Sequence, residues 1–186
     1  MAASPKIAKQ LHLPFQSGSS RVLKAMNRHY DRQQYEALVD YAKSVMPELV
    51  LTSDVIVGFP GETEEEFEET LTLIEKVRYD SLFTFIFSPR NGTPAASMED
   101  PTPKEEKNRR FDKLCALQNS ISEAIHSSYV GKTMRCLADG MDGEFLTART
   151  EGGRLVRLSA DESLVGSFID VTITGSTTWS LTGELA

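Results

Sequence analysis

Three polar side chains near the ends of predicted strands have the chemistry to bind one small molecule. Gln16 follows the short apolar segment 11–14, and its amide can both donate hydrogen bonds to hydroxyl groups and accept hydrogen bonds from them. Arg28 ends the helix predicted after Gln16, and a guanidinium can bind a carboxylate through two parallel hydrogen bonds. Asp54 lies inside a predicted buried strand, where a carboxylate is costly unless it is paired or binds ligand hydroxyls. Together the three suit a ligand that carries hydroxyl and carboxylate groups.

Each candidate also has a purely structural interpretation. Gln16 could be a turn residue, and Asp54 could pair with a neighbouring arginine or cap a helix. Arg28 could bind the carbonyl groups at the end of its own helix. Gly58 and Gly61 are equally open, because these glycines could let the backbone approach a ligand or could only permit a turn. The residue types alone leave both interpretations standing.

The first two thirds of the chain are predicted to alternate between strands and helices. A short helix begins at Ser19 or Ser20, whose side chains can cap it. A second helix begins at Asp31, which forms with Gln34 the D-x-x-Q variant of a capping box, and this helix ends before Pro47. The helices therefore have start and stop signals of their own.

Two further strands are predicted on either side of a third helix. Residues 50–59 are rich in β-branched residues and end at Pro60, as expected of a buried strand that meets a turn. Thr63 and Glu66 form a capping box for the helix that follows. Residues 81–88 are apolar on both faces, which predicts a parallel strand covered on both sides. The fold class is α/β, with three strands in an open sheet or in part of a larger barrel.

The predicted secondary structure changes in the last third of the sequence, from alternating strands and helices to short strands. A proline-containing loop over residues 89–103 precedes a long polar helix over 104–128. Five short strands separated by glycine- and acid-containing turns then predict a small antiparallel β-barrel. We therefore expect two domains, residues 1–128 and residues 129–186.

Composition excludes several classes of protein. No run of eighteen apolar residues could span a membrane and no signal sequence is apparent, so the expected location is the cytoplasm. Cys115 and Cys136 lack the spacing of a disulfide framework, a zinc site or an iron–sulfur site, and both are predicted to be core residues. His12, His29 and His126 also lack metal-ligand spacing. The two cysteines cannot supply the ligands of a cluster.

Charge constrains how the chain could bind RNA. The net charge of −7 argues against a nonspecific nucleic-acid binder. In the terminal barrel, eight acidic residues offset five basic residues, so any RNA-binding face must be one-sided. Trp179 is predicted to belong to the barrel core rather than to stack on bases. The candidate phosphate contacts are the five bases Lys132, Arg135, Arg149, Arg154 and Arg157.

Four segments resemble one enzyme family in the same order. LHLPFQSGSSRVLKAMNR at residues 11–28 is similar to the fourth barrel strand and following helix of radical S-adenosylmethionine tRNA methylthiotransferases. TSDVIVGFPGET at 52–63 resembles their fifth strand and its turn, and FTFIFSPRNGTPAA at 83–96 their sixth strand and the next loop. Residues 129–186, which end in TTWSLTGELA, resemble the TRAM domain, a small OB-like barrel that binds RNA.

The resemblance implies a fold and a reaction. It implies a partial, three-stranded α/β barrel of the radical enzymes followed by a TRAM barrel. S-adenosyl-L-methionine would contact Gln16, Arg28, Asp54, Gly58 and Gly61, and the terminal barrel would contact tRNA. Family members add a methylthio group to isopentenyl-modified adenosine next to the anticodon, using [4Fe–4S] clusters whose cysteine ligands this chain does not contain.

Two consequences and two alternatives follow from the resemblance. The chain alone is expected to be inactive, and its open sheet edges are expected to cause self-association. One alternative is a noncatalytic RNA-binding module. The other is the related methylthiotransferase that modifies a ribosomal protein.

Overall fold

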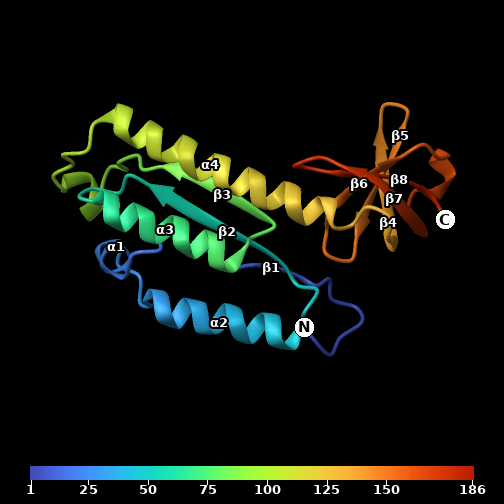
Figure 1. The fold of residues 1–186 in the computed structure, drawn as a ribbon, viewed down its shortest axis with the longest axis horizontal. Coiled ribbons are helices and arrows are strands. Elements are labelled where there is room, and N and C mark those ends of the chain that lie inside the picture. Colours follow the sequence, from blue (N-terminus) through green and yellow to red (C-terminus); the bar gives the residue numbers. More distant parts are fainter. The chain divides into compact units, whose positions relative to one another are not determined.

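The structure, a computed structural model, describes residues 1–186 and contains a three-stranded sheet in the order β1–β2–β3 (Figure 1). The strands are β1 (Gln10–His12), β2 (Val50–Val57) and β3 (Ser81–Ile86). Strand β2 pairs with β3 in parallel, with Asp54 opposite Phe83. Residue 16 extends the pairing beyond β1 through an isolated parallel bridge to Val55. The predicted parallel arrangement is confirmed.

Helices α1 (Ser20–Ala25), α2 (Arg32–Val45) and α3 (Glu64–Val77) connect these strands, and their predicted start signals are present. The Ser19 side chain accepts from the N–H of Val22 at the start of α1. Asp31 and Gln34 exchange hydrogen bonds of 2.8 and 3.0 Å before α2. Thr63 and Glu66 form the complete capping box of α3. Local side-chain chemistry therefore sets where each helix begins.

Aromatic rings form part of the core beside the sheet. Phe15 and Tyr79 are fully buried and stack with their ring centroids 5.3 Å apart. The Tyr79 hydroxyl donates to the hydroxyl of Tyr35 at 2.9 Å, and Tyr35 in turn donates to the carbonyl of Leu13 at 2.8 Å. This cluster fixes the chain between β1 and α1, the segment that contains Gln16.

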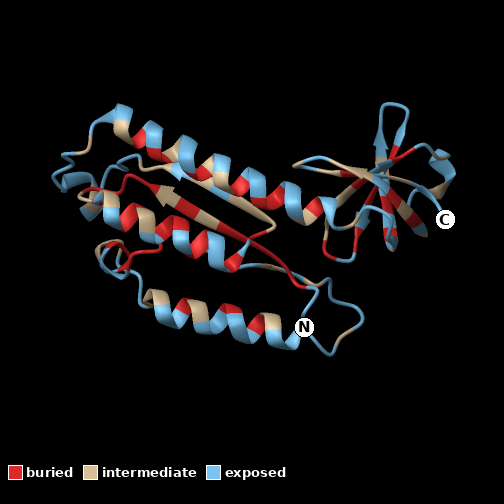
Figure 2. Cartoon of the chain, viewed as in Figure 1, coloured by how far each residue is buried: buried red, intermediate tan, exposed pale blue.

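Helix α4 (Lys104–Ser127), which follows the 3₁₀ turn η1 (Pro94–Ser97), covers only one face of β3 (Figure 2). On that face the Thr84 hydroxyl lies 3.6 Å from the Cys115 sulfur. On the other face Phe83 is 55% exposed and Phe85 52% exposed. The prediction that β3 is covered on both sides is therefore wrong, because both rings stay more than half exposed, although the His12 ring of β1 makes an edge contact with Phe83 at 5.8 Å between centroids.

The last five strands form a closed barrel in the order β4–β5–β6–β8–β7, as predicted, and its neighbouring strands are antiparallel except for β6 and β8, which pair in parallel. Its interior holds nine buried apolar side chains, among them Leu146, Val171 and Leu181. The 3₁₀ turn η2 (Glu162–Leu164) lies between β6 and β7 in the chain. Their bounds are β4 (Thr133–Asp142), β5 (Phe145–Thr150), β6 (Leu155–Leu158), β7 (Phe168–Ser176) and β8 (Leu181–Leu185).

Trp179 does not belong to the barrel core, contrary to the prediction. Its side chain lies in the turn between β7 and β8 and is 72% exposed. The turn is closed by the N–H of Thr177, which donates to the carbonyl of Ser180 at 2.8 Å. A tight turn at the barrel rim leaves the indole no path to the interior.

By contacts the chain divides into two units. One contains residues 12–45 and 51–119, and the other contains residues 1–11, 46–50 and 120–186. No helix is long and apolar enough to cross a membrane. The candidate small-molecule site lies in the first unit, and the candidate RNA-binding residues lie in the second.

Candidate functional site

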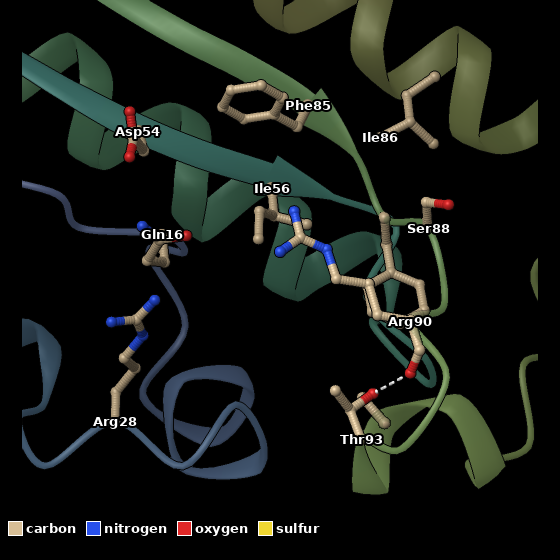
Figure 3. Close-up of a pocket in the computed structure, with 11 residues that line it drawn as sticks. Gln16, Arg28, Asp54, Ile56, Phe85, Ile86, Ser88, Arg90 and Thr93 are labelled. Atoms are coloured by element: carbon tan, nitrogen blue, oxygen red, sulfur yellow. Dashed lines mark hydrogen bonds between the residues drawn. The ribbon is translucent and has the colours of Figure 1, made fainter.

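A cavity of about 560 Å³ opens at the carboxyl ends of β2 and β3 (Figure 3). Cavities of this size are typical of small-molecule sites. Gln16, Arg28 and Asp54 all line it, although they come from three different elements. Ile56 and Phe85 supply apolar surface between them. The structure therefore brings the three polar candidates to one place.

Gln16 is held at the cavity by an unusual backbone conformation. Its φ is +66°, in the left-handed region that non-glycine residues seldom adopt. Its N–H donates to the carbonyl of Asp54 at 3.0 Å, and its carbonyl accepts from the N–H of Ile56 at 2.9 Å. These two bonds to β2 impose the conformation, and the residue is only 6% exposed. A surface turn residue would not be fixed in this way.

Asp54 lies beside a histidine rather than an arginine. Its Oδ1 atom is 3.4 Å from Nε2 of His12, and Nδ1 of His12 is 3.0 Å from the Thr52 hydroxyl. In the tautomer that carries its proton on Nε2, the ring points a donor at Asp54 and accepts from Thr52. The structure shows neither of the two structural alternatives, an ion pair with an arginine or a helix cap. The position of His12 just before Gln16 was the only signal that could have identified it.

Two guanidinium groups line the cavity without a hydrogen bond or ion pair. Arg28 lies beyond the last residue of α1, and its side chain is directed toward the site near Gln16 (Figure 3). Its backbone N–H donates to the carbonyl of Leu23 in α1 at 2.9 Å, but its guanidinium makes no hydrogen bond to the carbonyls of that helix. Arg90, from the loop after β3, lines the cavity beside Thr93. Either guanidinium is therefore available to donate two parallel hydrogen bonds to a ligand carboxylate.

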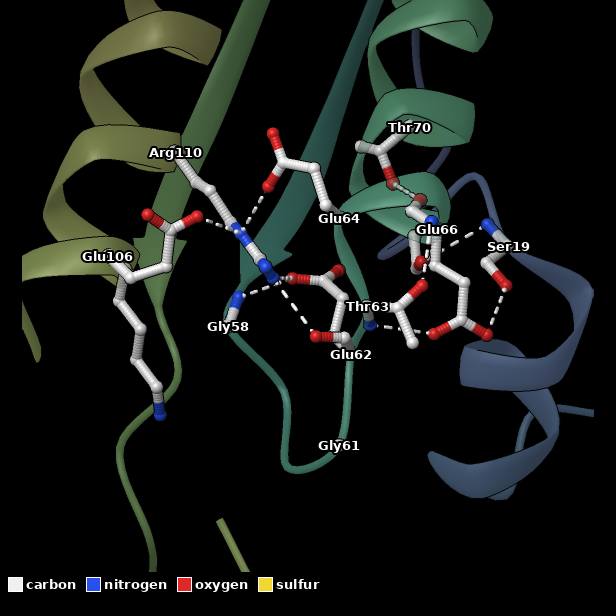
Figure 4. A network of polar contacts seen from close by, with 12 residues as sticks. Ser19, Gly58, Gly61, Glu62, Thr63, Glu64, Glu66, Thr70, Glu106 and Arg110 are labelled. Atoms are coloured by element: carbon white, nitrogen blue, oxygen red, sulfur yellow. Dashed lines mark hydrogen bonds and ion pairs between the residues drawn. The ribbon is translucent and has the colours of Figure 1, made fainter. Parts of the chain in front are cut away.

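Gly58 and Gly61 do not line the cavity. Both have a positive φ, of 70° and 73°, and both build the turn between β2 and α3 (Figure 4). A Cβ atom on Gly58 would lie 2.7 Å from side-chain carbons of Lys107. The carbonyl of Gly61 accepts from the Arg21 guanidinium at 2.7 Å. The structure gives both glycines a role in the turn, and their contact with a ligand stays a prediction.

The same turn is tied to α4 by a buried ionic network that the sequence did not reveal (Figure 4). Glu62 is almost fully buried, and its Oε2 atom accepts from the N–H of Gly58 at 2.8 Å. Arg110 donates to the Glu62 carbonyl at 3.0 Å, and its Nη1 lies 3.5 Å from the carboxylate. Burial disfavours the charged form and raises the pKa of Glu62 to about 7.

Arg110 has further partners outside the turn. Its Nε donates to Glu64 at 3.0 Å and to Glu106 at 2.9 Å. Ile56 and Asp54, which line the cavity, lie on β2, the strand that leads into this turn. No pattern of neighbouring residues predicts the contact, since Glu62 and Arg110 are far apart in sequence.

The five candidate RNA-binding bases occupy different surroundings in the barrel. Lys132 and Arg154 lie over the Tyr129 ring, at 5.1 and 4.4 Å from its centroid. Arg149 pairs with Asp139 at 2.9 Å, and Arg157 pairs with Asp142. Arg135 lies 4.5 Å from the centroid of Phe168.

The chain offers no set of side chains for a metal or a cluster. The described residues contain no group of three or more histidine, cysteine, aspartate or glutamate side chains that could hold an ion. Cys115 is half-buried and lies in the unit with the cavity, whereas Cys136 is buried in the barrel. Burial raises the pKa of the Cys136 thiol to about 11, away from the thiolate that metals require. These residues do not fit an iron–sulfur cluster.

The chain matches two protein-family models and is similar to several known enzymes. Residues 2–74 match the Radical SAM superfamily, and residues 127–186 match the TRAM domain. A tRNA-2-methylthio-N(6)-dimethylallyladenosine synthase of Acetivibrio thermocellus is 47% identical over 183 residues, covering 97% of this chain and 38% of that protein. Enzymes of the same name from Clostridium botulinum and Clostridium perfringens are 46% and 48% identical, with 42% and 41% of their lengths covered. The chain thus spans about two fifths of these relatives.

A solved structure supports the fold alone. Coproporphyrinogen III oxidase from Escherichia coli, described as a radical SAM enzyme, superposes with a TM-score of 0.52 at 17% identity. The similarity covers 88% of this chain and 41% of that one. A partial α/β barrel is therefore confirmed.

Proposed function

We propose that the chain is a segment of a tRNA methylthiotransferase and serves the methylthiolation of isopentenyl-modified adenosine next to the tRNA anticodon, a proposal supported by its matches to the Radical SAM superfamily and the TRAM domain and by its similarity to the synthases. The full reaction belongs to proteins more than twice as long, so we assign to this chain the binding of two reactants. One is S-adenosyl-L-methionine and the other is tRNA. We place the reaction in the cytoplasm, where tRNA is used.

We assign the S-adenosyl-L-methionine site to the cavity at the carboxyl ends of β2 and β3. The convergence of Gln16, Arg28 and Asp54 on one cavity carries this proposal. The unpaired Arg28 guanidinium suits the methionine carboxylate, and the Gln16 amide and Asp54 carboxylate suit ribose hydroxyls. Ile56 and Phe85 supply the apolar surface that a nucleoside base requires. When bound beside a reduced [4Fe–4S] cluster, this cofactor supplies the radical.

The residues of this chain bind and orient the cofactor but do not hold the cluster. Because Cys115 and Cys136 are the only cysteines, no step of the radical reaction can be assigned to this chain by itself. We therefore expect the isolated chain to bind reactants without turning them over.

For tRNA we propose contacts from Lys132, Arg135, Arg149, Arg154 and Arg157. Affinity that rests on phosphate contacts falls steeply with salt. All five lie in the region that matches the TRAM domain, which supports the assignment.

Calorimetric titration with S-adenosylhomocysteine tests the cofactor site without any cluster. We expect measurable binding by the chain as it stands. Asp54→Asn and Arg28→Gln should each weaken binding roughly tenfold, the effect of losing one charged hydrogen bond. Lys24→Gln, a charge removed from α1 outside the cavity, is the control and should bind as the wild type does.

The outcome separates the two classes of function. Binding that is lost in the Asp54 and Arg28 variants but not in the Lys24 variant supports the enzyme. A chain that binds tRNA and shows no affinity for S-adenosylhomocysteine would instead be a noncatalytic RNA-binding module.

A further inference from the structure

An exposed aromatic ring on the barrel surface lies in a row of side chains that crosses three strands. The register places Leu137 of β4 opposite Arg149 of β5 on one side and opposite Phe168 of β7 on the other. Arg135, two residues before Leu137, shares its face of β4. Phe168 is 63% exposed and Leu137 37% exposed. The row therefore offers a ring, an aliphatic side chain and two guanidinium groups to the outside.

These side chains line a second cavity, of about 610 Å³, within the same unit. Residues 5–8 form another of its walls. The charged side chains that line it are Lys6, Arg135 and Arg149 together with the acid Glu151, so cations outnumber anions. Outside the lining, Asp139 pairs with Arg149 and Asp170 lies opposite Arg135 in the register. The three cations are thus matched in number by three acids, but only Arg149 is in an ion pair, and Lys6 and Arg135 remain available to an anion.

Arg135 leaves the ring available for stacking. Its guanidinium lies 4.5 Å from the Phe168 centroid and covers part of the ring, while most of the side chain remains exposed. A flat ring beside guanidinium groups matches one nucleotide, because the base stacks on the ring and the phosphate meets the cations. Only an unpaired base can reach such a ring, since bases in a duplex are already stacked.

We propose that Phe168 stacks on one unpaired RNA nucleotide, with Arg135 and Arg149 binding its flanking phosphates. The proposal rests on the proposed tRNA function and deepens it, because it names a base contact and requires the bound RNA segment to be single-stranded. A hydrophobic peptide is the competing occupant, and it would not need the cations.

Fluorescence anisotropy with labelled RNA tests the proposal on the full chain. The probes are a single-stranded hexamer, a hexamer with abasic sites, and a duplex of the same length. Phe168→Leu should weaken binding of the hexamer roughly tenfold, since stacking is lost, and should leave binding of the abasic probe unchanged. Phe168→Trp should restore binding. Arg149→Gln should weaken binding of both single strands equally and reduce the salt dependence.

Phe145→Leu is the matched control. Phe145 is also on the barrel and is 51% exposed, but it does not line this cavity. Circular dichroism verifies that each variant is folded. The proposal is overturned if Phe168→Leu binds the hexamer as tightly as wild type does. It is also overturned if wild type binds the duplex as tightly as the single strand.

A tRNA titration separates this inference from the function on which it rests. If wild type binds tRNA and Phe168→Leu binds it equally well, the stacking proposal alone fails. If wild type binds neither tRNA nor the hexamer, the proposed tRNA contact fails as well. Binding of S-adenosylhomocysteine should be unchanged in every barrel variant.

Discussion

Gln16 and Glu62 are the residues whose local environment is most unusual. Gln16 has a left-handed backbone held by two hydrogen bonds to β2. Strain of this kind persists only where the surrounding structure imposes it, and it is common at ligand sites. Glu62 is a buried acid whose carboxylate accepts a hydrogen bond from the backbone N–H of Gly58. Both residues lie on segments that follow a strand, and Gln16 lines the first cavity.

Glu62 should make the stability of the protein depend on pH in a window below neutrality. Its pKa is raised from 4.5 to about 7 in the folded state, so the folded protein binds a proton more tightly than the unfolded chain. This contribution is fully present below about pH 4.5 and is lost as the pH rises toward 7, at a cost on the order of a few kcal/mol.

Urea denaturation of wild type and Glu62→Gln at several pH values checks this. The difference in free energy of unfolding between the two proteins should change between pH 4.5 and 7 and stay constant above. Comparing the difference removes the opposite contribution of Glu36 and Glu66, whose pKa values are lowered by ion pairs. Glu75→Gln, at an exposed position of α3, should show no such change. A difference that is constant from pH 4 to 8 would contradict the prediction.

At the scale of elements, Arg110 is the buried cation that links α4 to the turn between β2 and α3. Arg110 is buried and contacts Glu62, Glu64 and Glu106 at once. Its neighbour Arg109 also pairs with Glu64 and Glu106, but its side chain is 50% exposed. Adjacent arginines with similar partners and different burial make a matched comparison.

Arg110→Met should lower the free energy of unfolding by about 3 kcal/mol, because it leaves a buried carboxylate without its cation. Arg109→Met should leave stability nearly unchanged, since exposed ion pairs contribute little. Thermal and urea unfolding measure both. An equal loss of unfolding free energy in the two variants would show that the burial of Arg110 does not strengthen its ion pairs.

At the scale of the whole molecule, the three-stranded sheet is open at both edges. Strands β1 and β3 are its two edges, and the Phe83 and Phe85 rings of β3 remain exposed. Unpaired edges and an apolar face favour association with other chains. The enzymes that the chain matches are more than twice its length.

We therefore predict self-association of the isolated chain. Its mass by light scattering should rise with concentration, and Phe83→Ser combined with Phe85→Ser should lower the mass toward that of the monomer. Tyr41→Ser, at a 65% exposed position on α2, should leave association unchanged. A wild-type chain that stays monomeric at all concentrations would show that the open face is tolerated.

The sequence by itself determined the elements and their chemistry. Capping residues at Asp31 and Thr63 set helix starts, and alternating short strands predicted the terminal barrel, because these signals act between residues close in the chain. The polar types of Gln16, Arg28 and Asp54 indicated a ligand with hydroxyl and carboxylate groups.

Tertiary structure decided what depends on pairing between distant segments. The burial of Glu62 against Arg110, the exposure of Phe85 and Trp179, and the row that contains Phe168 all follow from packing and strand register. A shift of one residue in register turns a side chain to the other face of a strand. Local sequence signals contain no information on that choice, because the partner strand lies elsewhere in the chain.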